Sequence, residues 1–262
     1  MTAPSFPELT LPQMLREHAR LTPQRTAVRQ KDFGIWNPVS WKDYYERAAN
    51  VGHGYRALGL DAGSHVAVLS ENRVEWVLAQ LGAGLVGAVT IGVYPTSPAA
   101  EVAYVLEHAD AEVIVCEDQE QVDKVVEVRD RLPRLRRIVV VEVKGMRRYP
   151  ADLVVSFAAL EEAGAAHRAQ NPGLVDEALA RQRLEDTALM IYTSGSTGKP
   201  KGAMLTYANI RAQAVAVVEK LSLDRDATHL SYLPLCHVAE QMTTLMAPVY
   251  LGSQINFGES IR

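Results

Sequence analysis

The stretch Ala188-Leu-Met-Ile-Tyr-Thr-Ser-Gly-Ser-Thr-Gly-Lys-Pro-Lys-Gly202 is an apolar run that passes directly into a loop of small and hydroxyl residues. Residues 188–192 have the length and composition of a buried β-strand. Glycine, serine and threonine then favour a loop over a continued strand. Because ligand-binding loops in open α/β sheets follow the carboxyl ends of strands, residues 193–202 stand where such a loop is expected.

The loop of residues 193–202 has the chemistry of an anion-binding site. Its glycines let backbone N–H groups approach an anion closely, and its serine and threonine hydroxyls donate rotatable hydrogen bonds. Lys199 and Lys201 add compact positive charges. Together these groups predict a polyphosphate cradle.

This loop differs from a Walker A loop in two respects. Gly195 and Gly198 are too close together, and Pro200 stands where that motif has Ser or Thr after its lysine. P-loop kinases and GTPases are therefore disfavoured. A flexible glycine- and serine-rich surface loop is the structural alternative, because composition alone does not separate it from a phosphate cradle.

From about residue 64 onward, apolar runs of strand length alternate with segments of helical periodicity. This alternation predicts parallel strands with both faces covered, and so an α/β fold of layered sheets flanked by helices. The expected strands are residues 66–69, 88–91, 113–116, 138–143, 188–192, 229–233 and 254–257. The expected helices are residues 72–85 with Asn72 as the N-cap, 97–108, 122–131, 206–221 and 238–250.

Two more helices are predicted nearer the N-terminus. Thr10 and Gln13 have the spacing of a capping box at the start of a helix over residues 11–20. Ser40 is the expected N-cap of the second helix. The segment 144–186 is less regular, and we expect it to be a surface excursion with short helices.

Composition limits the class of protein. The 262 residues are 48% hydrophobic and 22% charged, enough to bury a substantial core, and the net charge of -4 predicts no general affinity for nucleic acid. Cys116 and Cys236 are far apart and lack metal-ligand spacing. The first residues lack a signal-peptide pattern, and no later run approaches about 18 apolar residues. These features predict a cytoplasmic protein.

Residues 192–202 match at every position the signature of the AMP-forming acyl-CoA synthetase, luciferase and peptide-synthetase adenylation superfamily, which the chain resembles. Within that superfamily, the Leu-Pro-x-x-His-x-x-Glu pattern of residues 233–240 is more similar to long-chain fatty acyl-CoA synthetases than to peptide-synthetase domains. Further resemblance lies in residues 66–76, 87–89, 93–98 and 232–240.

The resemblance implies a reaction in two steps. A fatty carboxylate attacks the α-phosphorus of ATP and releases pyrophosphate, and the thiol of coenzyme A then displaces AMP. It implies ATP, Mg²⁺ and coenzyme A as cofactors and a fatty acid as the small-molecule substrate. His237 is expected near the acyl carboxylate and adenylate, as a catalytic residue. The residues expected to hold the phosphates are Thr193, Ser194, Gly195, Ser196, Thr197, Gly198 and Lys199.

Several of these residues also have a purely structural interpretation. A lone histidine such as His237 is more often a core or helix-start residue. Glu240, in the first turn of a predicted helix, is expected to be solvated or to compensate the helix dipole, and we leave it out of the site. Residues 94–96 suit a turn better than a pocket border. The tryptophans are expected to be packing residues and not the lining of an acyl pocket: Trp36, Trp41 and Trp76.

The superfamily carries further functional elements that do not occur before Arg262: an aromatic-Gly-x-Thr-Glu segment, an Asp for ribose, a hinge and a mobile C-terminal domain with a catalytic Lys. We therefore expect residues 1–262 to form part of the N-terminal AMP-binding domain, without the C-terminal domain and without full ligase activity alone. The alternatives are a nucleotide-binding remnant or interaction module, and an adenylate-forming enzyme for another acid, such as an aryl-CoA ligase or fatty acyl-AMP ligase. The basic stretch of residues 134–148 predicts a solvated surface, with peripheral membrane contact as its alternative.

Overall fold

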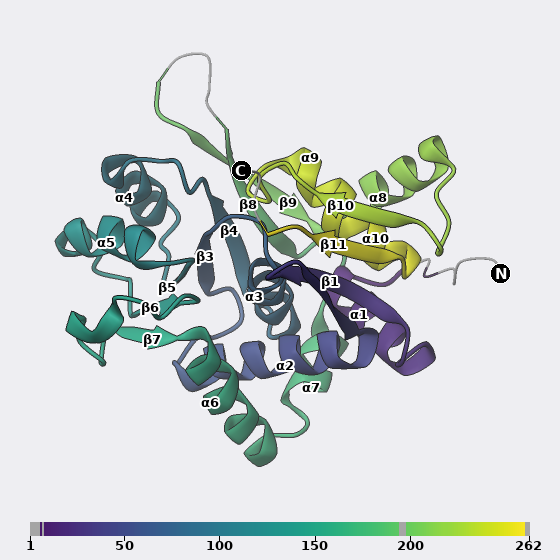
Figure 1. The fold of residues 1–262 in the computed structure, drawn as a ribbon, viewed down its shortest axis with the longest axis horizontal. Helices are drawn as coiled ribbons and strands as arrows, with labels where there is room; N and C mark the ends of the chain where they lie inside the picture. The colour runs from purple at the N-terminus through teal and green to yellow at the C-terminus, as the bar shows by residue number, and fades with distance from the viewer. Residues whose placement is uncertain (1–5, 7, 194–197, 260–262) are drawn as a thin grey trace.

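The computed structural model describes residue 6 and residues 8–193 and 198–259, which form two β-sheets with helices packed around them (Figure 1). The seven-stranded sheet has the order β7-β6-β5-β3-β4-β8-β9, and the four-stranded sheet has the order β10-β11-β1-β2. The predicted α/β fold of layered sheets is therefore confirmed. The strands of the large sheet are β3 (His65–Leu69), β4 (Val89–Val93), β5 (Val113–Cys116), β6 (Arg137–Val140), β7 (Val154–Ser156), β8 (Thr187–Thr193) and β9 (Lys201–Thr206). Those of the small sheet are β1 (Thr26–Asp32), β2 (Ile35–Ser40), β10 (Thr228–Ser231) and β11 (Gln254–Phe257).

Alternate residues of the large sheet face two different hydrophobic cores, as the period of two of a β-strand requires. Val66 and Val68 of β3 belong to the core that contains helix α3 and also reaches the small sheet. Ala67 and Leu69 belong to the core that contains helices α4 and α5 on the opposite face. The three helices are α3 (Val74–Leu85), α4 (Ala99–His108) and α5 (Gln119–Glu127).

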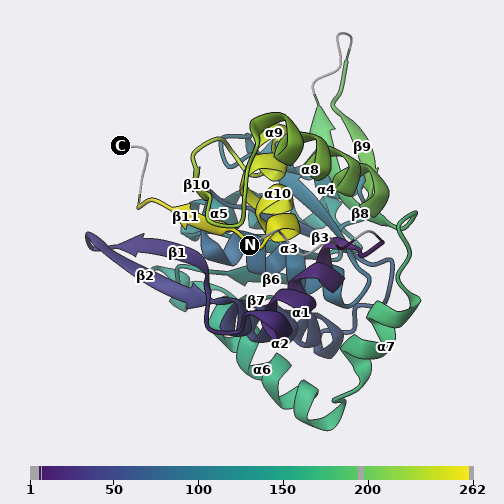
Figure 2. The same cartoon turned by 90° about the vertical axis from the view of Figure 1, so that its right-hand side faces the viewer.

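The strand order places a topological switch point between β3 and β4. The strands of the large sheet are parallel apart from β9, which pairs antiparallel with β8. The chain leaves β3 for α3 on one face and leaves β4 for α4 on the other. In such sheets the crevice outside the carboxyl ends of the strands at the switch point is the usual ligand site. Figure 2 shows the β8–β9 hairpin rising beyond the neighbouring helices near this edge.

The predicted helix starts near the N-terminus are confirmed. Thr10 and Gln13 form the capping box of α1. The Ser40 hydroxyl accepts a hydrogen bond from the Asp43 N–H (3.1 Å) at the start of α2. The remaining helices are α1 (Leu11–Leu21), α2 (Trp41–Ala57), α6 (Phe157–Gln170), α7 (Leu174–Arg181), α8 (Tyr207–Leu221), α9 (Val238–Glu240), the π-helix η3 (Gln241–Met246) and α10 (Ala247–Leu251), with short 3₁₀ turns η1 (Arg129–Arg131) and η2 (Met146–Arg148).

The segment 144–186 is largely exposed and contains helices, as expected of a surface excursion with short helices, but the prediction missed a strand and a packed helix. This segment contributes edge strand β7 and helix α6, which packs closely on α2. A Cβ atom on Gly164 of α6 would lie 1.7 Å from the Asn50 carbonyl oxygen, so glycine permits the close approach of the two helices. The alanine-rich sequence of α6 has weak helical amphipathicity, which explains why the face of α6 that packs on α2 was not predicted.

Three other features of the fold were not predicted. Strands β1 and β2 form a hairpin, and β9 begins inside the stretch interpreted as a loop. The helix expected over residues 238–250 is divided into α9, η3 and α10. Pro248 has no N–H to donate to the carbonyl four residues earlier, so regular α-helical bonding cannot continue through it.

Trp41 and Trp76 are buried as expected, whereas Trp36 on β2 is 37% exposed. The Arg29 guanidinium carbon lies 5.3 Å from the centroid of the Trp36 ring. Trp36 is therefore a surface residue in a cation–π contact. Within the part of the chain that the structure describes, no helix combines the length and the apolar character needed to cross a membrane.

Candidate functional site

A cavity of about 250 Å³ opens at the carboxyl edge of the large sheet, next to the switch point. Tyr94 and Ser97 line it from the segment between β4 and α4, and Thr193 and Pro200 line it from the β8–β9 hairpin. His237 completes it from the start of α9. The structure thus brings together Thr193 and His237, two site residues predicted from separate motifs, and it shows that Tyr94 borders the cavity as well as forming a turn.

The loop predicted to bind phosphate, residues 193–202, is described at its two ends. Gly198 has a φ of +116°, a left-handed conformation that glycine adopts without strain. The Lys199 ammonium lies 4.9 Å from the centroid of the Tyr104 ring on α4. Four of the predicted phosphate-binding residues lie outside the described residues: Ser194, Gly195, Ser196 and Thr197.

His237 is the N-cap of α9 and is exposed. Its Nδ1 atom accepts a hydrogen bond from the Ala239 backbone N–H, at 3.2 Å. A neutral imidazole in this arrangement carries its proton on Nε2. The Nε2–H is then a donor that can bind an anionic oxygen in the cavity.

The loop that carries His237 packs against β4 through backbone. A Cβ atom on Gly92 would lie 2.8 Å from Cys236 Cα, closer than packed carbon atoms tolerate. Glycine at this position therefore lets the loop reach the sheet. Burial raises the pKa of the Cys236 thiol to about 12, so this side chain is a neutral packing group and not a nucleophile.

Asn72 holds the same loop from the other side. Its Nδ2 donates hydrogen bonds to Ser231 Oγ (2.8 Å) and to the Leu233 carbonyl, and its Oδ1 accepts from the Leu235 N–H (2.8 Å). The prediction that Asn72 caps α3 was wrong, because the N-cap is Arg73. Sequence alone gave no sign of these contacts, which span about 160 residues of chain.

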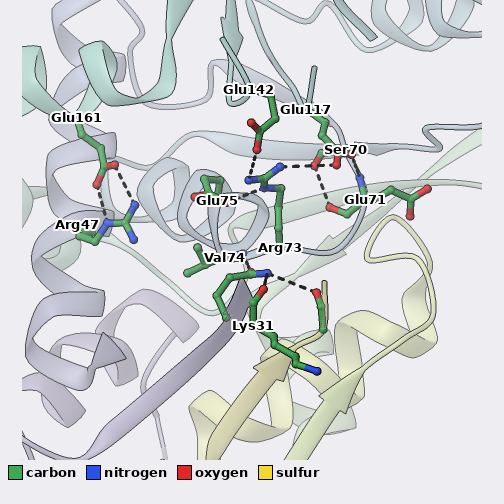
Figure 3. Close-up of polar contacts among 12 residues, drawn as sticks. Lys31, Arg47, Ser70, Glu71, Arg73, Val74, Glu75, Glu117, Glu142 and Glu161 are labelled. Carbon is green, nitrogen blue, oxygen red and sulfur yellow. Dashed lines mark hydrogen bonds and ion pairs between the residues drawn. The ribbon is translucent and has the colours of Figure 1, made fainter. Parts of the chain in front are cut away.

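Arg73 anchors the segment that carries Asn72. Figure 3 shows its guanidinium among three carboxylates, those of Glu75 (2.7 Å), Glu142 (2.9 Å) and Glu117 (3.6 Å). Glu117 also accepts the Glu71 backbone N–H (2.8 Å), and burial raises the pKa of Glu117. Since Glu117 and Glu142 follow β5 and β6, the network ties the β3–α3 segment to the neighbouring strands.

Glu240 is the main residue near the site that sequence reasoning misassigned. It was expected to be solvated, but it is 1% exposed. Its carboxylate accepts hydrogen bonds from Ser231 Oγ (2.7 Å), the backbone N–H groups of Tyr232 (3.1 Å) and Leu233 (3.2 Å), and the Thr244 hydroxyl. An acceptor-only group meeting four donors fixes the chain that leads into the His237 loop.

A larger cavity of about 660 Å³ lies at the opposite, amino-terminal edge of the sheet, with His65, Val89 and Thr187 in its lining. Met204 of β9 lines this cavity, but among the residues that the structure describes none of 193–202 or 233–240 does, so Thr193 and His237 are both absent from its lining. We therefore assign the candidate site to the smaller cavity.

No group of three or more His, Cys, Asp or Glu side chains within the described residues is arranged to hold a metal ion. Mg²⁺ bound with a nucleotide is held largely by phosphate oxygens and water, and needs only one or two protein carboxylates. The described residues thus define no protein-built Mg²⁺ centre.

The sequence profile of the family described as AMP-binding enzyme matches residues 15–261, so this chain belongs to the AMP-binding enzyme family. The long-chain-fatty-acid–CoA ligase ACSBG2 of Xenopus laevis is 31% identical over 260 residues, covering 97% of this chain and 34% of that protein. The corresponding mouse protein is 29% identical over 96% of this chain and 38% of its own length. The chain therefore spans about a third of the length of these curated relatives.

Solved structures show the same fold. The anthranilate CoA ligase AuaEII, in complex with anthranoyl-AMP, has a TM-score of 0.80 and 23% identity over 95% of this chain and 45% of that chain. The long-chain-fatty-acid-CoA ligase FadD1 from Archaeoglobus fulgidus has a TM-score of 0.79 and 20% identity over 100% of this chain and 49% of that chain.

Proposed function

We propose that this chain supplies the ATP-binding loop and part of the acid site of an enzyme that activates a long-chain fatty acid as its acyl-adenylate and then as its coenzyme A thioester. The observation that carries the proposal is the cavity that Thr193, Pro200 and His237 line together. The names of the curated relatives support a fatty acid as the substrate.

In this proposal the β- and γ-phosphates of ATP lie at the hairpin and the reacting carboxylate lies toward His237. A carboxylate oxygen bonds to the α-phosphorus while the bond to pyrophosphate breaks. Lys199 and the Thr193 hydroxyl stabilise the charge that accumulates on departing pyrophosphate, because prepositioned donors need no reorganisation during the reaction. The Nε2–H of His237 binds an oxygen of the carboxylate or adenylate.

ATP binding to this chain, measured by isothermal titration calorimetry, tests the phosphate site. Loss of one charge-assisted phosphate contact, about 1.5–3 kcal/mol, predicts that Lys199→Ala weakens ATP binding about tenfold or more. Lys220→Ala is the matched control, since Lys220 is an exposed lysine at the end of α8. Equal ATP affinities of the Lys199 variant and the unmodified chain would contradict the proposal.

The acid is tested with non-reactive acyl-sulfamoyl-adenosine analogues, whose binding requires no turnover. We expect a palmitoyl analogue to bind more tightly than benzoyl or aminoacyl analogues. Tighter binding of the benzoyl analogue would indicate an aryl-CoA ligase instead. Binding of ATP with no preference among acyl groups would indicate a nucleotide-binding remnant.

A further inference from the structure

Two residues of α4, Tyr104 and His108, lie one helical turn apart and face the β8–β9 hairpin. Side chains four residues apart share one face of a helix. Neither residue belongs to the motif at residues 192–202, and both contact its described ends. The centroids of their rings are 5.5 Å apart, so the two form one aromatic surface.

The first contact holds the strand that leads into the loop. His108 Nδ1 lies 2.7 Å from the hydroxyl of Tyr192, the second-last residue of β8. Tyr192 is 6% exposed, and burial raises the pKa of its hydroxyl to about 12. The Tyr192 hydroxyl is therefore protonated at neutral pH, and it pairs with His108 Nδ1 in a hydrogen bond.

The second contact holds the strand that leaves the loop. The Tyr104 hydroxyl donates a hydrogen bond to the Pro200 carbonyl, at 3.0 Å, immediately before β9 begins. A Cβ atom at Gly202 would lie 3.1 Å from the Tyr192 ring, so the two strands also pack closely on each other. One helix thus fixes both ends of the loop.

The third contact places the charge. The Lys199 ammonium lies over the face of the Tyr104 ring at 4.9 Å, within the range of a cation–π interaction. A free lysine side chain loses much rotamer freedom when it binds a phosphate. Contact with Tyr104 restricts Lys199 before the ligand arrives, which lowers that entropic cost.

We propose that Tyr104 and His108 are positioning residues of the ATP site, with Tyr104 holding Lys199 and Pro200, and His108 holding Tyr192, so that the lysine meets the β- and γ-phosphates. The inference rests on the proposed role of Lys199 in phosphate binding. If Tyr104 and His108 have this role, replacing them should weaken the binding of ligands that carry β- and γ-phosphates more than the binding of ligands that lack these phosphates.

The test compares ATP with AMP, which lacks the two terminal phosphates, by isothermal titration calorimetry on the full chain. Tyr104→Leu removes ring and hydroxyl, and we expect ATP binding to weaken about fivefold or more while AMP binding changes less than about twofold. Tyr104→Phe keeps the ring, and its ATP affinity should fall between those of Tyr104→Leu and the unmodified chain. His108→Leu should also weaken ATP more than AMP.

A double-mutant cycle separates positioning from general damage to the fold. If Tyr104 acts through Lys199, the effect of Tyr104→Leu on ATP binding should be largely lost in a Lys199→Ala background. Equal losses of ATP and AMP binding, or fully additive effects, would overturn the inference. Tyr104→Gln serves as a second ring-deletion variant if the leucine substitution does not fold, because Tyr104 is only partly buried.

The outcomes also separate the inference from the proposed function. A strong effect of Lys199→Ala with no effect of either ring-deletion variant would overturn the role of Tyr104 alone. No effect of Lys199→Ala would remove the phosphate-site assignment, and the positioning role with it.

Discussion

The substitution Glu240→Gln tests whether the buried carboxylate of Glu240 stabilises the loop that carries His237. Glutamine has nearly the same shape but replaces one acceptor oxygen with an NH₂ donor. One carboxylate oxygen accepts from Ser231, Tyr232 and Thr244, and the other accepts from the Leu233 N–H. In one orientation the amide NH₂ of the variant faces the Leu233 N–H, which can only donate. In the other it faces the Tyr232 N–H, which can only donate, and the hydroxyls of Ser231 and Thr244, which must rotate away.

The magnitude follows from the contact that is lost. A hydrogen bond to a charged acceptor contributes about 1.5–3 kcal/mol, and a buried donor left without a partner costs about 1–3 kcal/mol. The neutral amide costs less to bury than a carboxylate, which offsets part of this loss. We therefore expect Glu240→Gln to lower the free energy of unfolding by about 2 kcal/mol.

Urea denaturation followed by far-ultraviolet circular dichroism measures this change, with an unchanged m-value as the check on two-state behaviour. Glu219→Gln is the matched control, because Glu219 is exposed on α8 and a surface change should stay within about 0.5 kcal/mol. If Glu240→Gln is as mild as this control, the buried network does not stabilise the loop and the reasoning fails.

Two further predictions concern packing and pH. Gly92→Ala should displace the loop at Cys236, which should lower the free energy of unfolding by about 1–3 kcal/mol and weaken binding of the palmitoyl-adenylate analogue. Gly173→Ala is the control for both measurements, because its added Cβ meets nothing closer than 3.6 Å. Burial lowers the pKa of His18 from 6.5 to about 4. The unfolded chain therefore binds this proton first, and stability should fall as pH drops from 6.5 toward 4, by about 3 kcal/mol from this residue. Urea titrations across that range should show a smaller loss for His18→Gln, and parallel pH profiles of the two proteins would refute the assignment.

Local signals in the sequence predicted much of the fold because they act over one or two turns of chain. The capping box of Thr10 and Gln13 and the apolar runs of β3, β4, β5 and β8 are of this kind. The β1–β2 hairpin was missed because β2 is largely exposed and lacks the apolar alternation of a half-buried strand. Helix α6 was underestimated because its packing depends on a glycine contact with α2.

The amino-acid sequence was enough to predict the family, the alternation of strands and helices from β3 to α5, and two groups of candidate site residues, one around Thr193 and one at His237. It did so because glycine-rich anion loops, strand runs and helix caps depend on neighbours in the chain. That Thr193 and His237 line one cavity became evident from the folded chain and not from the sequence. The three-dimensional contacts also show that Glu240 is buried, that Asn72 bonds to the chain near His237, and that Tyr104 bonds to Pro200. Local patterns do not encode these features, because the burial and the partners of a side chain are set by residues brought together from distant parts of the chain.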